Sequence, residues 1–421
     1  MLSRLILLSL AVAGVSLPAT ILHCGKFVDV VNLAVRENVS ITVEGNRIQS
    51  VSNDFAAGEA IDLKSHTCMP GFLDMHVHLV SESNPKTYEE RFRLNGVDHA
   101  YRSVVYARRT LLAGVTTVRD LGARDGVSIS LRNAIQQGLI DGPRIFAAGT
   151  SLATTGGHAD PTNGVRNDLL GDPGPKDGVV NGVEDARKAV RQRYKEGADV
   201  IKITATGGVL SVAASGENPQ FTEEEVRAIV ETAKDYSFHV AAHAHGAEGM
   251  KRAIRAGVHS IEHGTLMDDE AIALFKEKGT WWVPTISAGQ FVAAKAEVPG
   301  YYPDVVKAKA LAIGPKIIET FRKAYAAGVK IAMGTDCGVC LHGDNARELV
   351  YMHQAGMPPL ETIQVSTLRG AQLLGIDHEV GTLERGKLAD IIATSEDPRA
   401  DLSTVTRVSF VMKQGKVYKR P

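Results

Sequence analysis

Short apolar runs alternate with amphipathic stretches through the middle of the chain. The apolar runs have the length of buried parallel strands. They lie at residues 72–77, 115–119, 143–148, 199–204, 240–243, 260–263, 281–284 and 330–335. Helical spacing of apolar residues separates several of them, at residues 183–195, 222–234, 247–256 and 268–278. Eight such units predict an α/β fold, a (β/α)8 TIM barrel over residues 70–379.

Glycines mark the helix ends that this pattern predicts. A glycine follows a helical stretch and precedes the next strand at Gly114, Gly197, Gly257, Gly279 and Gly328. Glycine is favoured there because the residue after a helix often adopts a left-handed backbone. The connections are therefore typical of helices that lead directly into parallel strands.

The two ends of the chain differ from the middle. Residues 20–69 and 380–421 read as short strands separated by turn residues, with few helical patterns. The simplest arrangement pairs the strands of one end with those of the other. We therefore expect one small β-sandwich domain, built from both chain ends, beside the barrel.

Composition narrows the class of protein. The chain has 421 residues, 44% of them hydrophobic, and a formal net charge of −1. The length suffices for a large barrel and a smaller domain. The balanced charge gives no reason to expect nucleic acid as a partner, and no internal stretch is apolar enough to span a membrane. We expect a small-molecule substrate and a homo-oligomer.

The first nineteen residues resemble a secretory signal peptide. Arg4 precedes an apolar run over residues 5–15, and Ser16-Leu17-Pro18-Ala19 follows. This favours a secreted or periplasmic protein. A short buried strand or an anchor is the alternative interpretation, and a cytoplasmic location goes with it.

The four cysteines do not form the pattern of a small disulfide scaffold. Cys337-Gly338-Val339-Cys340 is a lone C-x-x-C after a predicted strand, whereas a redox pair normally opens a helix. We interpret it as a loop near the site, in which a local disulfide could form after export.

The candidate chemistry lies at the ends of the predicted strands, where barrel enzymes place their active sites. His76 and His78 end the first strand, and residues i and i+2 of a strand point the same way. Two imidazoles thus point at one place, as a shared metal requires. Four further candidates lie at or near other strand ends: Lys202, His243, His263 and Asp336.

Each residue alone has an ordinary structural explanation. A histidine can be a hydrogen-bonded core group, Lys202 can extend its amine to water, and Asp336 can cap the next helix. Six such coincidences at one end of one barrel favour a metal site instead. A lysine ammonium cannot bind a metal, but a buried amine can react with carbon dioxide. The resulting carbamate is an anion with two oxygens, which could bridge two cations.

These motifs resemble the amidohydrolase superfamily, in its two-metal branch with a carboxylated lysine on the fourth strand. The similarity runs from Pro70-Gly71-Phe72-Leu73-Asp74-Met75-His76-Val77-His78 to Gly386-Lys387-Leu388-Ala389-Asp390-Ile391. Residues 201–209 and 155–160, and the step of twenty residues from His243 to His263, are similar to prolidase-like Xaa-Pro and Xaa-Arg/Lys dipeptidases and to ochratoxinase-type amidases.

The resemblance implies two divalent metals, zinc by default. His76, His78 and Asp336 would hold the first, His243 and His263 the second, and carboxylated Lys202 would bridge them with a hydroxide that attacks the substrate. Asp336 would act as general acid and base. His245 would stabilise the oxyanion or bind a substrate carboxylate, and His158 is a weaker substrate-binding candidate.

The expected activity is hydrolysis of an amide bond in dipeptides or N-acyl amino acids, prolidase-like or carboxypeptidase-like, with ochratoxin-type amides included. An imidazolonepropionase-like or deaminase-like enzyme with one metal is an alternative, which Lys202 disfavours. A lactonase or organophosphate hydrolase with the same ligands is another. A non-enzymatic metal-binding protein is disfavoured by the complete ligand set. The chain has neither G-x-S-x-G nor H-E-x-x-H, which disfavours serine hydrolases and zincins.

Overall fold

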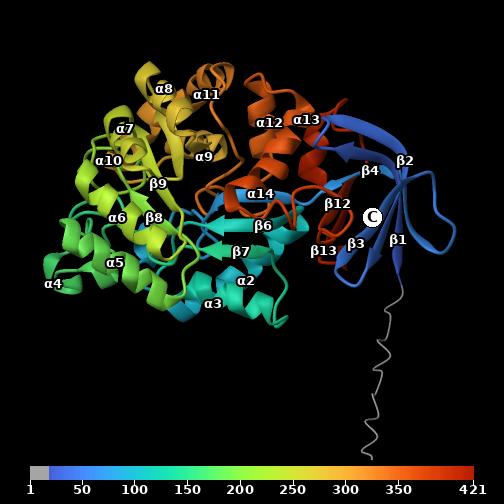
Figure 1. Ribbon diagram of the computed structural model, residues 1–421. Helices are drawn as coiled ribbons and strands as arrows, with labels where there is room; N and C mark the ends of the chain where they lie inside the picture. Colours follow the sequence, from blue (N-terminus) through green and yellow to red (C-terminus); the bar gives the residue numbers. More distant parts are fainter. Residues whose placement is uncertain (1–18) are drawn as a thin grey trace, which may run out of the picture.

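The structure is a computed structural model and describes residues 19–421. Figure 1 shows a large body of strands and helices beside a sheet made from the blue N-terminal and red C-terminal segments. Among the described residues, no helix has the length and apolar character needed to cross a membrane.

The sheet beside the large body contains both ends of the chain, as expected. Its strands are β1 (Thr20–Asp29), β2 (Ala34–Glu44), β3 (Arg47–Asn53), β4 (Ala60–Pro70), β12 (Ile391–Thr394), β13 (Phe410–Lys413) and β14 (Lys416–Lys419). Their order is β14-β13-β12-β4-β1-β2-β3. The strands form one continuous sheet, whereas a sandwich has two. The reason is the long strand β4, which pairs in parallel with β1 and, through residues 67–70, antiparallel with β12.

Seven of the eight strands expected in the large body are present, all with parallel neighbours. One sheet has the order β5 (Phe72–Val77), β6 (Val115–Asp120) and β7 (Arg144–Ala147). The other contains β8 (Ile201–Thr204), β9 (Val240–Gly246), β10 (Ser260–Leu266) and β11 (Trp281–Val283). Strands β9 and β10 each continue three residues past their predicted ends, and their pairing shifts register after His263.

The eighth predicted strand, residues 330–335, is an extended segment with a single bridge, from Ile331 to Trp282. It still lies between two strands, because Lys330 accepts a hydrogen bond from Trp282 N of β11 (2.8 Å) and Met333 accepts one from Met75 N of β5 (2.9 Å). The backbone N–H of Thr335 is shared between the Asp74 carboxylate (3.0 Å) and His76 O of β5 (3.3 Å).

The helices surround these strands. They are α1 (Thr87–Glu90), α2 (Gly96–Leu112), α3 (Val127–Gln136), α4 (Asn167–Leu170), α5 (Val183–Glu196), α6 (Glu223–Asp235), α7 (Ala247–Ala256), α8 (Asp269–Lys278), α9 (Ile286–Ala296), α10 (Asp304–Ile313), α11 (Ile317–Ala326), α12 (Arg347–Gln354), α13 (Pro359–Val365) and α14 (Leu368–Leu374). Short 3₁₀ turns are η1 (Pro175–Asp177), η2 (Gly314–Lys316) and η3 (Leu402–Arg407). Gly197, Gly257 and Gly279 end their helices with a left-handed backbone, as the pattern predicted.

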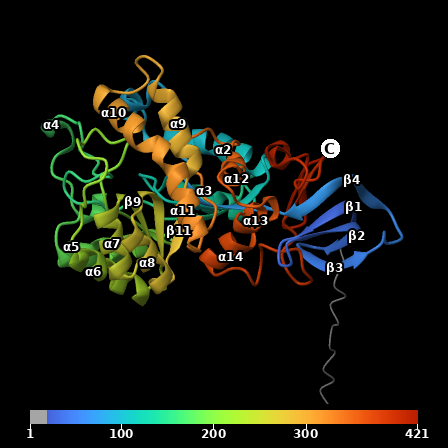
Figure 2. The ribbon, with the colours of Figure 1, turned by 90° about the horizontal axis from the view of Figure 1, so that it is seen from above.

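Helices α9 and α10 form an excursion after β11, which we call the α9–α10 hairpin (residues 286–313). Figure 2 shows the two helices side by side, extending beyond the neighbouring helices. A hydrophobic cluster separate from the main core joins the hairpin to the loop after β8, through Val209, Val292, Tyr301, Tyr302 and Val306. This cluster fixes the hairpin near the ends of the strands.

All four cysteines are paired. The Cys337–Cys340 bridge has a Cα–Cα distance of 4.4 Å and agrees with the local disulfide considered from the sequence. The Cys24–Cys68 bridge, with a Cα–Cα distance of 5.9 Å, was not predicted. It joins β1 to β4, which are neighbours in the sheet although 44 residues separate the two cysteines.

Candidate metal centre

All six predicted metal-binding residues line one pocket at the ends of the parallel strands. His76, Lys202, His243 and His263 lie on β5, β8, β9 and β10, and His78 and Asp336 directly follow extended backbone. The other two predicted site residues, His158 and His245, line the same pocket. The structure therefore brings together every residue that the sequence marked.

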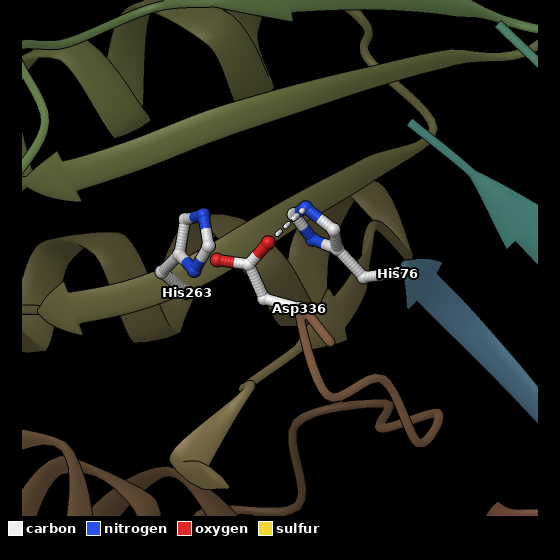
Figure 3. Close-up of side chains that lie close together, drawn as sticks. All are labelled: His76, His263 and Asp336. Carbon is white, nitrogen blue, oxygen red and sulfur yellow. Dashed lines mark ion pairs between the residues drawn. The ribbon is translucent and has the colours of Figure 1, made fainter. Parts of the chain in front are cut away.

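Asp336 lies between imidazoles. Its Oδ1 atom is 3.4 Å from Nε2 of His76 and 3.2 Å from Nε2 of His78, yet this buried oxygen has no hydrogen-bond partner. Figure 3 shows the carboxylate between the rings of His76 and His263, and these three residues offer ligand atoms within 4.8 Å of one another. Two ligands of a tetrahedral zinc ion are about 3.4 Å apart. An orphaned oxygen at this spacing fits a cation.

Each of the four candidate ligand histidines has one ring nitrogen held by the protein. The pairs are His76 Nδ1 with Glu262 Oε2 (3.0 Å), His78 Nδ1 with Gly122 O (3.0 Å), His263 Nδ1 with Thr285 Oγ1 (2.7 Å) and His243 Nε2 with Gly207 O (3.0 Å). Metal-binding histidines normally donate their second nitrogen to such an acceptor. The arrangement leaves Nε2 of three rings and Nδ1 of His243 for a metal.

The electrostatics favour the metal-binding form of three of these histidines and of Asp336, whereas at His78 burial would lower the pKa but Asp336 outweighs it and raises it. Burial lowers the pKa of His76 to about 4 and holds the pKa of His243 and of His263 well below the usual value. These imidazoles are therefore neutral at pH 7. Burial would raise the pKa of Asp336, but the nearby His76 and His78 outweigh it and lower the pKa to about 2.

Lys202 is buried beside these ligands. Its Nζ atom is 3.4 Å from His76 Nε2, and only 4% of the residue is exposed. Burial lowers its pKa to about 8, although Glu262 and Asp336 oppose this change. The amine is therefore much easier to deprotonate than a surface lysine, which is the condition for reaction with carbon dioxide.

Two site residues have a left-handed backbone that non-glycine residues seldom adopt. The φ angle is 70° at His263 and 59° at Asp336. Thr285, which holds the ring of His263, has a φ angle of 54°. Such conformations cost about 1–3 kcal/mol each and persist where the surroundings impose them. Their concentration here indicates that the surrounding packing sets the orientation of these side chains.

Comparison with known proteins places the chain in a family. Residues 67–418 match the Amidohydrolase family. The chain belongs to this family. Its curated relatives include ochratoxinase of Aspergillus niger, 34% identical over 374 residues that cover 84% of this chain and 76% of ochratoxinase. The chain is accordingly an enzyme, a hydrolase of amide bonds, and the His76–His263–Asp336 group is a candidate site for the divalent metal that the family generally uses.

Solved structures of related amidohydrolases share the fold. A Xaa-Pro dipeptidase with methionine bound in its active site is 51% identical, with a TM-score of 0.93, covering 96% of this chain and 100% of the other. A prolidase in complex with N-methylphosphonate-L-proline is 32% identical, with a TM-score of 0.85 and the same coverage.

The sequence did not reveal the groups behind the ligands of this amidohydrolase. Glu262 is fully buried, binds His76 and pairs with Arg119 at 2.8 Å, and Arg119 also donates to Met75 O (2.7 Å). Arg119 and His76 lower the pKa of Glu262 to about 2 even though burial would raise it. The sequence did hold a signal: Arg119 and Glu262 each lie within a predicted strand, and an unpaired charge in a buried strand would be costly.

Asp74 is a second buried carboxylate whose role the sequence did not show. It accepts hydrogen bonds from the backbone N–H of His76 (3.1 Å) and of Thr335 (3.0 Å), and from the side chain of Asn345 (2.8 Å). It therefore joins the segment carrying His76 to the segment that leads to Asp336. The signal was its place in the Leu73-Asp74-Met75-His76 run.

His245 and His158 lie against His243, a candidate ligand. His245 is held by Thr265 Oγ1 (2.9 Å), and its ring centroid is 4.7 Å from that of His243. Burial lowers its pKa to about 4, so it is neutral rather than cationic. The ring of His158 stacks on His243 with a centroid distance of 4.4 Å, and its buried Nδ1 has no partner.

Two adjacent glycines make this stacking feasible. A Cβ at Gly208 would overlap the ring of His158, and a Cβ at Gly207 would overlap the Ser215 carbonyl. The Gly207 carbonyl itself binds His243. The Thr206-Gly207-Gly208 segment thus brings backbone against both histidines.

Proposed function

We propose that this amidohydrolase cleaves an amide bond in dipeptides or N-acyl amino acids with two divalent ions, by default zinc. The observation that carries the proposal is a set of four histidines, three of them with strongly lowered pKa values, around a single pocket with one anionic aspartate and one buried lysine. His76, His78 and Asp336 would hold one ion, and His243 and His263 the other. The short distances among His76, His263 and Asp336 support two sites close together.

Lys202 would bridge the ions as a carbamate. The neutral Nζ lone pair attacks the carbon of carbon dioxide, a C–N bond forms, and one proton leaves to solvent. The lowered pKa of Lys202 supports this step because it increases the share of neutral amine. The product exchanges a cation for an anion beside two metal sites, which the ions would stabilise.

When bound, the two ions would polarise the scissile carbonyl and lower the pKa of water to near neutrality. The Asp336 carboxylate would take a proton from the attacking water and give it to the leaving nitrogen. A carboxylate has two oxygens, so one can bind an ion while the other accepts the proton. The neutral His245 and His158 donate hydrogen bonds either to the developing oxyanion or to a substrate carboxylate. Methionine and a proline phosphonate in the related structures support substrates derived from amino acids.

The fold supports the same proposal. We propose that residues 330–335 close the seven parallel strands into the predicted (β/α)8 barrel, beside the small domain of residues 20–69 and 380–421. At the other junction, Asp199 N donates to Ala147 O (2.8 Å) and Leu152 N donates to Lys202 O (2.8 Å), which links β7 to β8. Closure would place all strand ends around one site.

Export is also proposed. Residues 1–18 lie outside the described part of the chain, so the predicted signal peptide over residues 1–19 lies outside it except for Ala19. The two disulfides support a secreted or periplasmic location, because disulfides persist in oxidising compartments. The homo-oligomer stays a prediction.

The test is a substrate screen with measured metal content. Protein prepared with zinc and bicarbonate should contain two ions per chain and hydrolyse dipeptides and N-acyl amino acids. Lys202→Ala should lose ions and activity together, and short-chain carboxylic acids should restore part of the activity by replacing the carbamate. A stoichiometry that stays at one removes the bridging role. Hydrolysis confined to lactones, phosphotriesters or imidazolone-type cyclic amides replaces the proposed substrate class.

A further inference from the structure

The pocket has an aliphatic wall that the metal chemistry does not use. It is formed by three parts of the chain: the loop after β8, the α9–α10 hairpin with η2 and α11, and the loop after Asp336. The wall residues are Val209, Leu210, Val292, Ile313, Ile317 and Val339. We call this set the aliphatic wall.

The aliphatic wall is a fixed surface. Two glycines of the pocket, Gly289 on α9 and Gly314 in η2, approach so closely that a Cβ on either would lie 3.0 Å or 2.7 Å from the carbonyl oxygen of the other. Behind the wall, Tyr301 and Tyr302 pack with Val292 in one cluster. The wall is therefore part of a packed core, and its shape exists before substrate binds.

A buried lysine ties the loop after β8 to the hairpin. Lys309 on α10 donates from Nζ to the carbonyls of Gly208 (2.8 Å), Ser211 (2.6 Å) and Ala213 (2.8 Å). Three carbonyls occupy the three donors of the ammonium. Lys309 does not line the pocket, so its charge is used for holding the loop and is not offered to a substrate.

The aliphatic wall itself offers no charge to a substrate side chain. Among the residues lining the pocket, the only carboxylate is Asp336 and the only amine is Lys202, and the proposed function assigns both to the metals. A charged group against the aliphatic wall would lose its water and gain no partner, which costs much more than an aliphatic group would. An uncharged aliphatic chain gains from burial instead, by about 0.8 kcal/mol per methylene.

We propose that the site selects substrates whose side chain next to the scissile amide is aliphatic and uncharged, of the size of leucine or methionine. The inference rests on the proposed function, since it names the substrate class of the same site. Each added methylene up to that size should raise kcat/KM about fourfold. Lysine, arginine, aspartate and glutamate at that position should be poor substrates.

The experiment uses zinc-loaded full-length enzyme and two dipeptide series, varied at one residue and constant at the other. Each series contains alanine, leucine, methionine, glutamine, lysine and glutamate. In one of the two series, dipeptides with leucine or methionine at the varied position should have a kcat/KM about 100-fold higher than those with lysine or glutamate. Lysine or glutamate cleaved as well as leucine in both series overturns the inference but leaves the proposed function intact. No cleavage of any peptide, together with cleavage of lactones or phosphotriesters, overturns the proposed function itself.

Placing a negative charge on the aliphatic wall tests directly whether the wall selects the substrate side chain. Val292→Asp should raise the ratio of lysine to methionine kcat/KM at least tenfold, because the new carboxylate would pair with the ammonium. Leu210→Asp, at a half-buried position of the same wall, serves if Val292→Asp does not fold. Val305→Asp is the matched control, since this exposed valine of α10 does not line the pocket, and its ratio should equal that of the wild type. An unchanged ratio in a folded, metal-loaded wall variant removes the wall from substrate selection.

Discussion

The seven-stranded sheet and the strand-end pocket use polar groups in opposite ways. The core of the sheet is an apolar cluster that includes Leu22, Ile41 and Phe410, and a disulfide joins two of its strands. The pocket and the residues behind it bury Lys202, Glu262 and Asp336, and a carboxylate oxygen of Asp336 is left without a partner. The sheet core stabilises the fold, whereas the buried polar groups of the pocket lower stability and hold the candidate ligands in place. Changes in the two regions should therefore affect different measurements.

The largest effect is expected at Asp336. Asp336→Asn keeps the size of the side chain but cannot carry the proton, so kcat should fall by about 10³-fold while the unfolding temperature changes little. Because the carboxylate is also a proposed ligand, turnover and metal content must be measured in one sample. Near-normal turnover at full metal loading would remove the acid–base assignment.

Phe410 tests the other side of the comparison. This side chain is fully buried in the sheet core, so Phe410→Ala should lower the free energy of unfolding by about 3–5 kcal/mol. The folded fraction should keep its kcat/KM within about twofold. Denaturant unfolding and active-site titration give the two quantities, and a large loss of kcat/KM per folded molecule would break the contrast.

Loss of the Cys24–Cys68 disulfide should also lower the free energy of unfolding, by less than the Phe410→Ala change does. Replacing both cysteines with serine should lower the free energy of unfolding by about 2–4 kcal/mol, since the bridge restricts the unfolded chain. Activity should not change. The contrast would fail if the double variant kept its stability, or if it lost metal.

The smallest effect on the metal site is expected at Glu262, which belongs to both roles. Glu262→Gln should weaken zinc binding about 10–100-fold, because the amide orients His76 less well. The folded-state pKa of about 2 lies below the unfolded value of about 4.3, so the carboxylate stabilises the fold above pH 4.3 and loses this contribution as the pH falls toward 2. The variant should lack that part of the acid unfolding profile. Unchanged zinc affinity would show that Glu262 serves the fold alone.

The sequence predicted what depends on local pattern. Strand β5 was predicted with its observed bounds. The two-residue spacing of His76 and His78 correctly placed both side chains in one pocket. Residues 330–335 were predicted as a strand because the run is apolar, but the segment forms a single bridge and its Thr335 N–H is shared between the Asp74 carboxylate and His76 O. Contacts of this kind join residues 261 positions apart, and pattern alone does not show them.

The unpredicted parts of the site share a physical cause. A regular strand alternates its side chains, so adjacent Glu262 and His263 should point to opposite faces. The left-handed backbone at His263 breaks the alternation, and both side chains reach His76 or its surroundings. Similarly, the pairing of Cys24 with Cys68 depends on the register of β1 and β4. The linear sequence fixes neither feature by its spacing.

The glycines at positions 207 and 208 have a consequence for how this enzyme can evolve. Adding one methyl group at Gly208 would push against His158, and adding one at Gly207 would displace the carbonyl that holds His243. No single amino-acid replacement at either position avoids this, because every other residue has a Cβ. New substrate preferences in descendants of this chain should therefore arise through the surrounding aliphatic side chains, whose size and charge can change in small steps while these two positions stay invariant.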